Sequence, residues 1–338
     1  YGGGLSYHHL IWDVLRGVGS NTIGASSRKE LTVNENYEQG RGANYTDYYG
    51  HVSSFNEDGF QLDHVSGEPP FYVNQTGRTY VAWCWKAGGG SNTFNVDGTG
   101  YATASAAGIT DGSIALTGAS VNREAGFSMV TYAGTGSAGT VGHGLGKKPT
   151  FWLMKNTSDT SGWFTYYTFT DGSLDYMYLD TTAAKANSNA SVPTTTTVGA
   201  TSSLSTSGDT WIVYAWTDIP GYSKFGVYTG NGSANGPFIH LGFRPALFIQ
   251  KKTSGTGNWY IFDNKRSGFN VDNDMLTPNL TDAEYDGQTY PRLDFVSNGI
   301  KWVDAGSSVH NASGETYIYM AFAERPSGTI FGVDANAR

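Results

Sequence analysis

Cysteine is almost absent from this sequence, whose 338 residues contain only Cys84. A single thiol cannot form a disulfide bond within the chain, so packing has to stabilise the fold in an oxidising environment. Cys84 lies in the apolar run of residues 81–85, and such surroundings are typical of a buried structural thiol rather than a reactive one. We therefore expect Cys84 to be buried.

Charge and long hydrophobic runs are also scarce. Only 15% of the residues are charged, no run of Lys and Arg exceeds two residues, and the formal net charge is −8. A nucleic-acid partner calls for a clustered basic face, so the sequence argues against one. No stretch approaches the roughly 18 consecutive apolar residues of a transmembrane helix, and we expect no membrane insertion.

Glycine and aromatic residues, in contrast, are abundant: there are 46 glycines, and aromatic residues make up 14% of the chain. Glycine destabilises helices, whereas aromatic and β-branched residues suit the pleated surface of a sheet. The composition therefore predicts an all-β fold. Turn signals spaced roughly 8–12 residues apart are typical of sandwiches and barrels, and we expect tandem β-sandwich domains of the jelly-roll or lectin-like kind.

Three stretches of the chain are versions of one another. Residues 77–85, 208–216 and 314–322 each read Gly, a charged residue, Thr, an aromatic residue and an apolar run that ends in an aromatic residue. A Gly-x-Thr turn before such a run is typical of a strand entry, so each copy predicts a strand. The copies lie too far apart for a solenoid repeat of roughly 20–50 residues and suit tandem globular units of roughly 100 residues.

Other pieces recur around these strands. Residues 8–13, 162–167 and 258–263 match one another, and their last residues are Asp13, Tyr167 and Asp263. The first copy lacks the front hairpin that precedes the strand in the other two copies. We therefore expect the first domain to be incomplete, with the chain starting inside a repeat.

The repeats divide the chain into five predicted segments. They are a partial first β-sandwich at residues 1–87, a Gly/Ala/Ser-rich connector with short strands at 88–125, a second β-sandwich at 126–220, a third at 221–326 and a C-terminal tail at 327–338. The connector reads either as a flexible linker or as edge strands, and we favour short strands that pack on the next domain.

Several phrases of these repeats resemble a known family. They lie at residues 80–90, 142–146, 221–232, 242–246, 258–266 and 317–324. Together they are similar to a repeated domain of virion proteins from marine bacteriophages, cyanophage-like and pelagiphage-like, including tail-fibre proteins. The resemblance implies a tail-fibre-like or other virion structural protein of β-sandwich domains on the exterior of the particle. It assigns no residue to catalysis.

The polar motifs predict structure more than chemistry. His143 and His240 recur before strands that begin at a proline, which favours a bond to the turn backbone over a ligand role. The equivalence of Asp13 and Asp263 favours a role in the fold over a glycosidase carboxylate pair. Residues 270–274 resemble the start of a calcium loop but lack its remainder, so we expect a solvated turn. The sequence predicts a protein that is not an enzyme and holds no cofactor and no metal.

Aromatic residues in polar stretches are the candidates for ligand binding. Aromatic rings stack on sugar faces, and tyrosine adds a hydrogen bond, although such residues also cover core edges and subunit interfaces. The candidates are Tyr45, Tyr48, Tyr49 and Tyr72. Residues 181–207, rich in Ala, Thr, Ser and Asn, are expected to form an exposed, variable loop of the kind that carries recognition.

These observations lead to one hypothesis and two alternatives. We expect a tail-fibre-like virion protein that recognises a host surface glycan or outer-membrane protein, with avidity from many copies. A homo-oligomer, with a trimer favoured, and contacts with other virion proteins go with this hypothesis. The alternatives are a capsid decoration or adaptor protein and a polysaccharide depolymerase.

Overall fold

A computed structural model describes the chain at residues 8–20, 28–40, 50–64, 73–266, 270–272, 274–285, 292–304 and 309–323. Within these ranges every element is a β-strand apart from one 3-10 turn, η3 (Ser202–Leu204). The predicted all-β fold class is therefore confirmed. None of the described segments forms a helix of the length and apolar character needed to cross a membrane.

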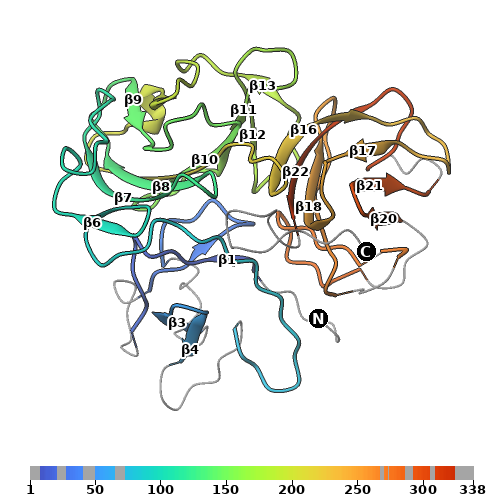
Figure 1. Ribbon diagram of the computed structural model, residues 1–338, viewed down its shortest axis with the longest axis horizontal. Helices are drawn as coiled ribbons and strands as arrows, with labels where there is room; N and C mark the ends of the chain where they lie inside the picture. Colours follow the sequence, from blue (N-terminus) through green and yellow to red (C-terminus); the bar gives the residue numbers. More distant parts are fainter. Residues whose placement is uncertain are drawn as a thin grey trace.

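A nine-stranded sheet forms the largest layer (Figure 1) and dominates what we call the second unit, residues 94–216. Its strands are β5 (Phe94–Val96), β6 (Thr99–Tyr101), β7 (Leu116–Asn122), β8 (Phe127–Ala133), β10 (Phe151–Asn156), β11 (Phe164–Tyr167), β12 (Asp175–Tyr178), β13 (Ala186–Asn187) and β15 (Thr210–Trp216). They follow the order β13-β12-β11-β10-β15-β8-β7-β5-β6, and only β5 and β7 run parallel. The stretch interpreted as a connector, residues 88–125, thus supplies three strands of this sheet.

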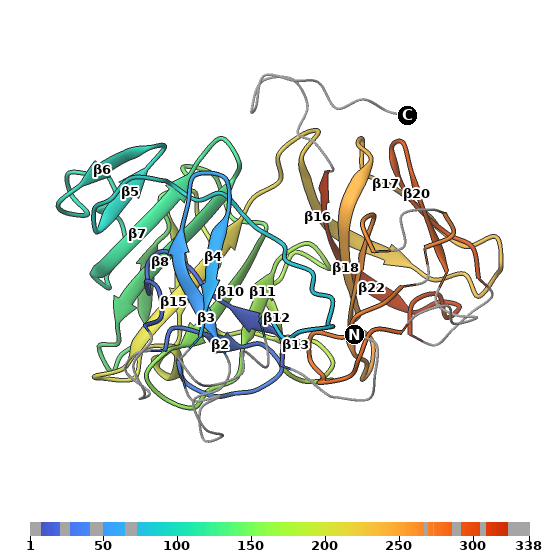
Figure 2. The same cartoon turned by 90° about the horizontal axis from the view of Figure 1, so that it is seen from below.

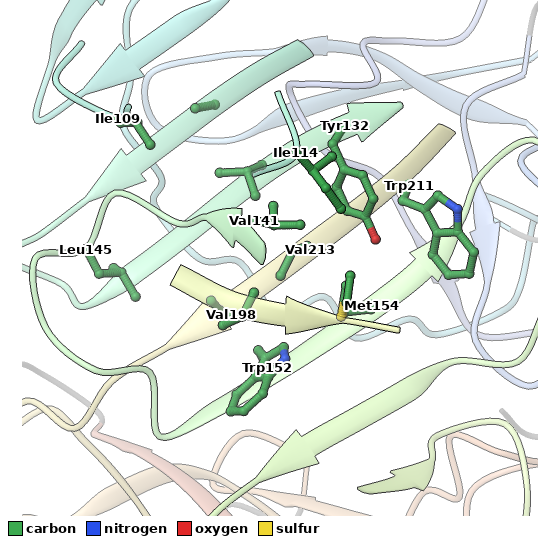
Figure 3. Packing of buried hydrophobic residues seen from close by; sticks show 14 of the residues in the cluster. Ile109, Ile114, Tyr132, Val141, Leu145, Trp152, Met154, Val198, Trp211 and Val213 are labelled. Carbon is green, nitrogen blue, oxygen red and sulfur yellow. The ribbon is translucent and has the colours of Figure 1, made fainter. Parts of the chain in front are cut away.

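A short second layer covers one face of the nine-stranded sheet. It consists of β9 (Gly139–Gly142) and β14 (Thr197–Ala200), which pair antiparallel. In the core between the layers, Trp152 and Val213 of the sheet share a buried cluster with Val141 and Val198 of the second layer (Figure 3). The apolar faces of both layers are thereby removed from water.

The second layer corrects the prediction of an exposed loop over residues 181–207. Val198, Ala200 and Leu204 of this stretch are buried, because β14 and the turn η3 close the core. The Tyr132 hydroxyl, from the sheet, donates a 2.5 Å hydrogen bond to the Leu204 carbonyl oxygen. Small polar residues surround these few apolar ones, so the strand pattern in the sequence is weak here.

The third unit, residues 223–323, repeats the two-layer plan. One layer contains β16 (Ser223–Thr229), β18 (Pro245–Lys252), β19 (Trp259–Asp263) and β22 (Thr316–Ala323), in the order β16-β22-β18-β19. The other contains β17 (Phe238–His240), β20 (Leu293–Val296) and β21 (Gly299–Trp302), in the order β17-β21-β20. Phe248, Trp302 and Tyr317 are fully buried between them.

The first unit, residues 8–87, is the least regular. Its described strands are β1 (Leu10–Ile11), β2 (Leu31–Thr32), β3 (His51–Phe55) and β4 (Phe60–Asp63). β1 pairs with β2, and β3 pairs with β4 in a hairpin that protrudes from the body (Figure 1).

Two of the three predicted Gly-x-Thr strands are confirmed, as β15 and β22, and the third is not. Residues 81–87 form no β ladder with any described residue, because no described strand flanks them as β8 and β10 flank β15. Their side chains still alternate between the interior and solvent, as in a strand. Cys84 points outward, so the expectation of a buried thiol is wrong.

The three units pack around a common core (Figures 1 and 2). The aromatic residues that end the three Gly-x-Thr copies, Trp85, Trp216 and Phe322, meet there. The Trp85 ring lies edge-on to the other two, with ring centroids 6.0 Å from Trp216 and 5.4 Å from Phe322. The repeated sequence thus produces an approximate threefold arrangement within one chain.

Candidate interaction surface

The junctions between units repeat one hydrogen bond. Trp163 of the second unit donates from Nε1 to the Thr32 carbonyl oxygen of the first unit at 2.9 Å. Trp259 of the third unit donates in the same way to the Tyr178 carbonyl oxygen of the second unit, also at 2.9 Å. Each indole is fully buried, and each bond satisfies a donor that would be costly to leave unpaired.

The matching position in the first unit is His9, and its ring faces the third unit. The Thr277 backbone lies beside the His9 ring and favours its protonated form. His9 Nε2 is nevertheless buried without a hydrogen bond of normal geometry. Burial lowers the pKa of His9 to about 4, with a smaller effect from neighbouring positive charge. Among the described residues, the junction between the first and third units therefore lacks the side-chain-to-carbonyl hydrogen bond that the tryptophans make at the other two junctions.

Side-chain caps confirm that these positions are equivalent. The backbone N–H groups of His9, Trp163 and Trp259 each donate to a side-chain oxygen of the paired segment: Asn34 Oδ1, Asp180 Oδ1 and Asn279 Oδ1, at 3.2, 3.0 and 2.8 Å. The same local geometry recurs three times although the side chains differ.

A buried lysine strengthens each of the two tryptophan junctions. Lys155 Nζ donates to the Asn36 carbonyl oxygen of the first unit at 3.1 Å and lies 5.9 Å from the ring centroid of Trp163. Lys251 Nζ donates to the Thr181 carbonyl oxygen of the second unit at 3.3 Å and lies 5.7 Å from the ring of Trp259. Burial lowers the pKa of both lysines to about 8. Their repetition at equivalent places marks them as parts of the fold.

Asp13 and Asp263 are structural, as their equivalence suggests. Each accepts from the Nε of an arginine three residues later, Arg16 at 2.5 Å and Arg266 at 2.7 Å. Each also accepts backbone N–H bonds from the following turn. A carboxylate held by a guanidinium and two amides is committed to the turn rather than to chemistry on a substrate.

Asp13 also accepts a hydrogen bond across the junction between the first and second units. The Tyr214 hydroxyl of the second unit donates to Asp13 Oδ2 at 2.6 Å, in full burial. The residues matching Asp13 and Tyr214 at the next junction are Tyr167 and Met320, both in the shared core. The hydrogen-bonded pair of Asp13 and Tyr214 at the first junction is thus replaced at the second by Tyr167 and Met320, which pack among apolar residues.

The remaining titratable groups are divided between core and surface. His143 is fully buried, its Nδ1 accepts from the Leu145 backbone N–H at 3.2 Å, and burial lowers its pKa to about 4. The predicted bond to the turn backbone is therefore confirmed for His143. His240 is exposed, so the shared role inferred for it is wrong, because the proline-aligned registers place it opposite Gly144.

Asp272, at the centre of the predicted solvated turn, is buried instead. Asp272 is 2% exposed and its backbone pairs with Leu293 of β20, while Asn270 Nδ2 donates to the Phe295 carbonyl oxygen at 3.1 Å. Burial raises the pKa of Asp272 to about 7. Within the described ranges, no group of three or more His, Cys, Asp or Glu side chains is placed to hold a metal ion.

The predicted binding tyrosines, Tyr45, Tyr48, Tyr49 and Tyr72, lie outside the described residues. A different aromatic patch is described on the outer layer of the third unit, and we call Phe238, His240 and Lys301 the outer patch. Phe238 is 49% exposed, and its ring lies edge-on to His240 at a centroid distance of 6.2 Å. Lys301 lies directly across the ladder from Phe238 and donates from Nζ to Asn235 Oδ1 at 2.6 Å.

The outer patch follows from the alternation of β17. Ile239 points into the core, so its neighbours Phe238 and His240 share the solvent face. The sequence pattern predicts this arrangement, because an apolar residue lies between an aromatic residue and a polar one in a short edge strand. It was missed because recurrence of histidine suggested a role in the fold.

A second exposed apolar region lies on the first unit. We call residues 81–85 the open strand: Val81, Trp83 and Trp85 pack on the shared core, whereas Ala82 and Cys84 face solvent. None of these five residues makes a backbone hydrogen bond to another described residue. Phe55 and Phe60, paired at the end of the β3–β4 hairpin, are each 37% exposed.

Comparison with known proteins gives a family match without a function. A family described as a domain of unknown function, DUF7483, matches residues 7–326. No curated protein and no solved structure matches the chain.

Proposed function

We propose that this chain, which belongs to the DUF7483 family, is a non-enzymatic, tail-fibre-like virion protein that recognises a host surface through its outer patch. The observation that carries the proposal is the exposure of Phe238 beside His240 and Lys301 on a rigid layer. An exposed aromatic ring flanked by polar groups suits stacking on a sugar face with hydrogen bonds to its hydroxyls. The ligand class is therefore a surface glycan.

The body behind the patch supports this role. β21 lies between β17 and β20, and the fully buried Ile300 and Trp302 anchor it to the core of the third unit. A rigid support reduces the entropy lost when a weak ligand binds. Many copies on one particle would then raise the apparent affinity without new contacts.

The experiment is a binding measurement with a matched control. The purified chain is incubated with marine bacterial cells and with polysaccharide extracted from them. Phe238→Ser should lower binding by about tenfold or more, whereas Val192→Ser, which alters another exposed apolar side chain, in the second unit, should leave it unchanged. Equal binding by both variants, or no binding by the parent chain, contradicts the proposal.

A capsid decoration or adaptor role is the second candidate, and the open strand favours it because unpaired strand edges suit protein contacts. Absence of glycan binding together with co-purification of another virion protein would place this role first. A depolymerase would instead release reducing ends from the same polysaccharide, and that release is measured in the same incubation.

A further inference from the structure

The outer layer of the third unit presents a row of three different side chains to solvent. β17, β21 and β20 pair in this order (Figure 1), so Phe238 lies directly across from Lys301, which lies directly across from Asp294. Ile239 and Ile300, next to them along the strands, are buried, and alternation turns the three side chains outward. We call Phe238, Lys301 and Asp294 the outer row. It extends the outer patch across the whole layer.

The Phe238 ring, at one end of the row, leans over the neighbouring strand at a glycine. Gly299 lies diagonally across the β17–β21 ladder from Phe238. A Cβ atom on Gly299 would come 3.0 Å from Phe238 Cε2 and 2.1 Å from the Ile239 carbonyl oxygen. The absence of a side chain therefore leaves room for the ring along the surface of the sheet. A ring in this position offers a face to a ligand, and the face is the part of an aromatic ring that stacks.

Lys301, in the middle of the row, is held on the β17 side. Its Nζ donates to Asn235 Oδ1 at 2.6 Å and to the Gly236 carbonyl oxygen, and both residues lie just before β17. An ammonium group has three hydrogens, so these two bonds leave one for a further acceptor. The two bonds also keep the charge of Lys301 close to Phe238.

Asp294, at the other end of the row, has no donor. Opposite charges directly across a ladder stabilise a sheet when they pair, but Lys301 is held elsewhere. Asp294 Oδ1 is buried without a hydrogen-bond partner among the described residues. Burial raises the pKa of this carboxyl group, and the nearby Arg292 opposes the effect only in part. An acceptor left without a donor is costly, so a donor from outside the chain would be favoured here.

We propose that the outer row binds a stretch of polysaccharide that lies across the strands, with Phe238 stacking on one sugar residue and Asp294 accepting hydrogen bonds from hydroxyl groups of a neighbouring one. Paired strands lie about 4.8 Å apart, so the row spans about 10 Å from β17 to β20. A single sugar ring is too short to meet both ends. Lys301 donates its remaining N–H to an oxygen between them.

Asp294 also makes the row selective. An ionised carboxylate only accepts hydrogen bonds, so the sugar residue beside it needs free hydroxyl groups. A sulfate or carboxylate on that residue would bring two negative charges together, which is unfavourable. The ligand class is therefore a neutral sugar at the Asp294 end of the row. This inference rests on the proposed glycan-binding role and adds to it a specificity-determining residue and a minimum length of ligand.

The test uses the full chain and the polysaccharide extracted from marine bacterial cells. Asp294→Ala should lower binding by about tenfold or more, because hydrogen bonds to a charged group are lost. Asp294→Asn, which keeps the shape of the side chain, should also bind more weakly than the parent. Asp111→Ala, which removes an exposed carboxylate of the second unit, should bind as the parent does. Equal urea midpoints for the variants and the parent would show that the fold is intact.

Competition by fragments of the same polysaccharide tests the length. After partial acid hydrolysis, fragments of two or more residues should displace the polysaccharide, whereas single sugars should require at least about tenfold higher concentration. Binding that Phe238→Ser weakens and both Asp294 variants leave unchanged overturns this inference while the glycan-binding role stands. Single sugars that compete as well as the longer fragments overturn it as well. Failure of the parent chain to bind overturns the glycan-binding role and this inference with it.

Discussion

Trp163 of the second unit and Thr32 of the first are joined by a 2.9 Å hydrogen bond between the indole N–H and the carbonyl oxygen, although 131 residues separate them along the chain. The bond has a counterpart between the third and second units, and its geometry depends on how the units meet. It is therefore a sensitive point at which to test the packing.

Replacing Trp163 or Trp259 with Phe should destabilise the chain beyond the loss of ring volume. Each change leaves a buried carbonyl oxygen without its donor, which costs about 1–3 kcal/mol. Urea unfolding measures the effect. Trp152→Phe is the matched control, because Trp152 is equally buried but its Nε1 has no partner. Equal losses at all three sites would show that the hydrogen bonds contribute nothing.

Asp13→Asn should be severely destabilising. It removes the carboxylate that pairs with buried Arg16 and accepts from Tyr214, and breaking one side of a buried ion pair costs about 3–5 kcal/mol. Arg123→Gln, which breaks an exposed ion pair with Asp97, should cost no more than about 1 kcal/mol. Urea midpoints distinguish the two, and similar losses would contradict a buried, structural role for Asp13.

His143 should make the chain less stable in mild acid. Its pKa is about 4 in the folded chain, below the ordinary value of 6.5, because burial disfavours the charged ring. Between these values the unfolded chain binds the proton first, so stability falls as the pH drops from 6.5 towards 4, by up to about 1.4 kcal/mol per pH unit. His143→Gln should reduce this slope and leave the slope above pH 6.5 unchanged. An unaltered acid slope would show that His143 is not buried neutral.

Asp272 should have the opposite effect. Burial raises its folded pKa to about 7, above the ordinary 3.8, so the folded chain keeps a proton that the unfolded chain has released. This contribution to stability grows as the pH falls from 7 towards 4 and is lost above 7. Asp272→Asn preserves the acceptor for the Asp274 N–H, so it should remove this dependence and stabilise the chain in alkaline buffer. Lower stability of the variant in alkaline buffer would contradict the raised pKa.

The sequence predicted the class of the fold and part of its strands. The run after Gly208 and the run after Gly314 form β15 and β22, because flanking strands are available to pair with them. The run after Gly77 has the same local pattern but forms no ladder with any strand in the described part of the chain. A strand is defined by its partners, so periodicity alone could not distinguish the three copies.

The sites depended more strongly on three-dimensional context. Cys84 is exposed because no described strand flanks it, and Asp272 is buried because it pairs with Leu293. Neither relationship is visible in the residues next to them in sequence. The outer patch could have been found, since alternation in β17 places Phe238 and His240 on one face.

Trp85, Trp216 and Phe322 meet in a core to which all three units contribute. Each unit contributes one ring, and each would expose an apolar inner face, such as Leu247 and Ile318 of the third unit, if it were cut away. An isolated unit would recover that burial only by associating with two others. One polypeptide thus contains the approximate threefold arrangement that three separate subunits would form by association. Because the three units are not copies of one gene product, each can differ from the others in sequence and surface.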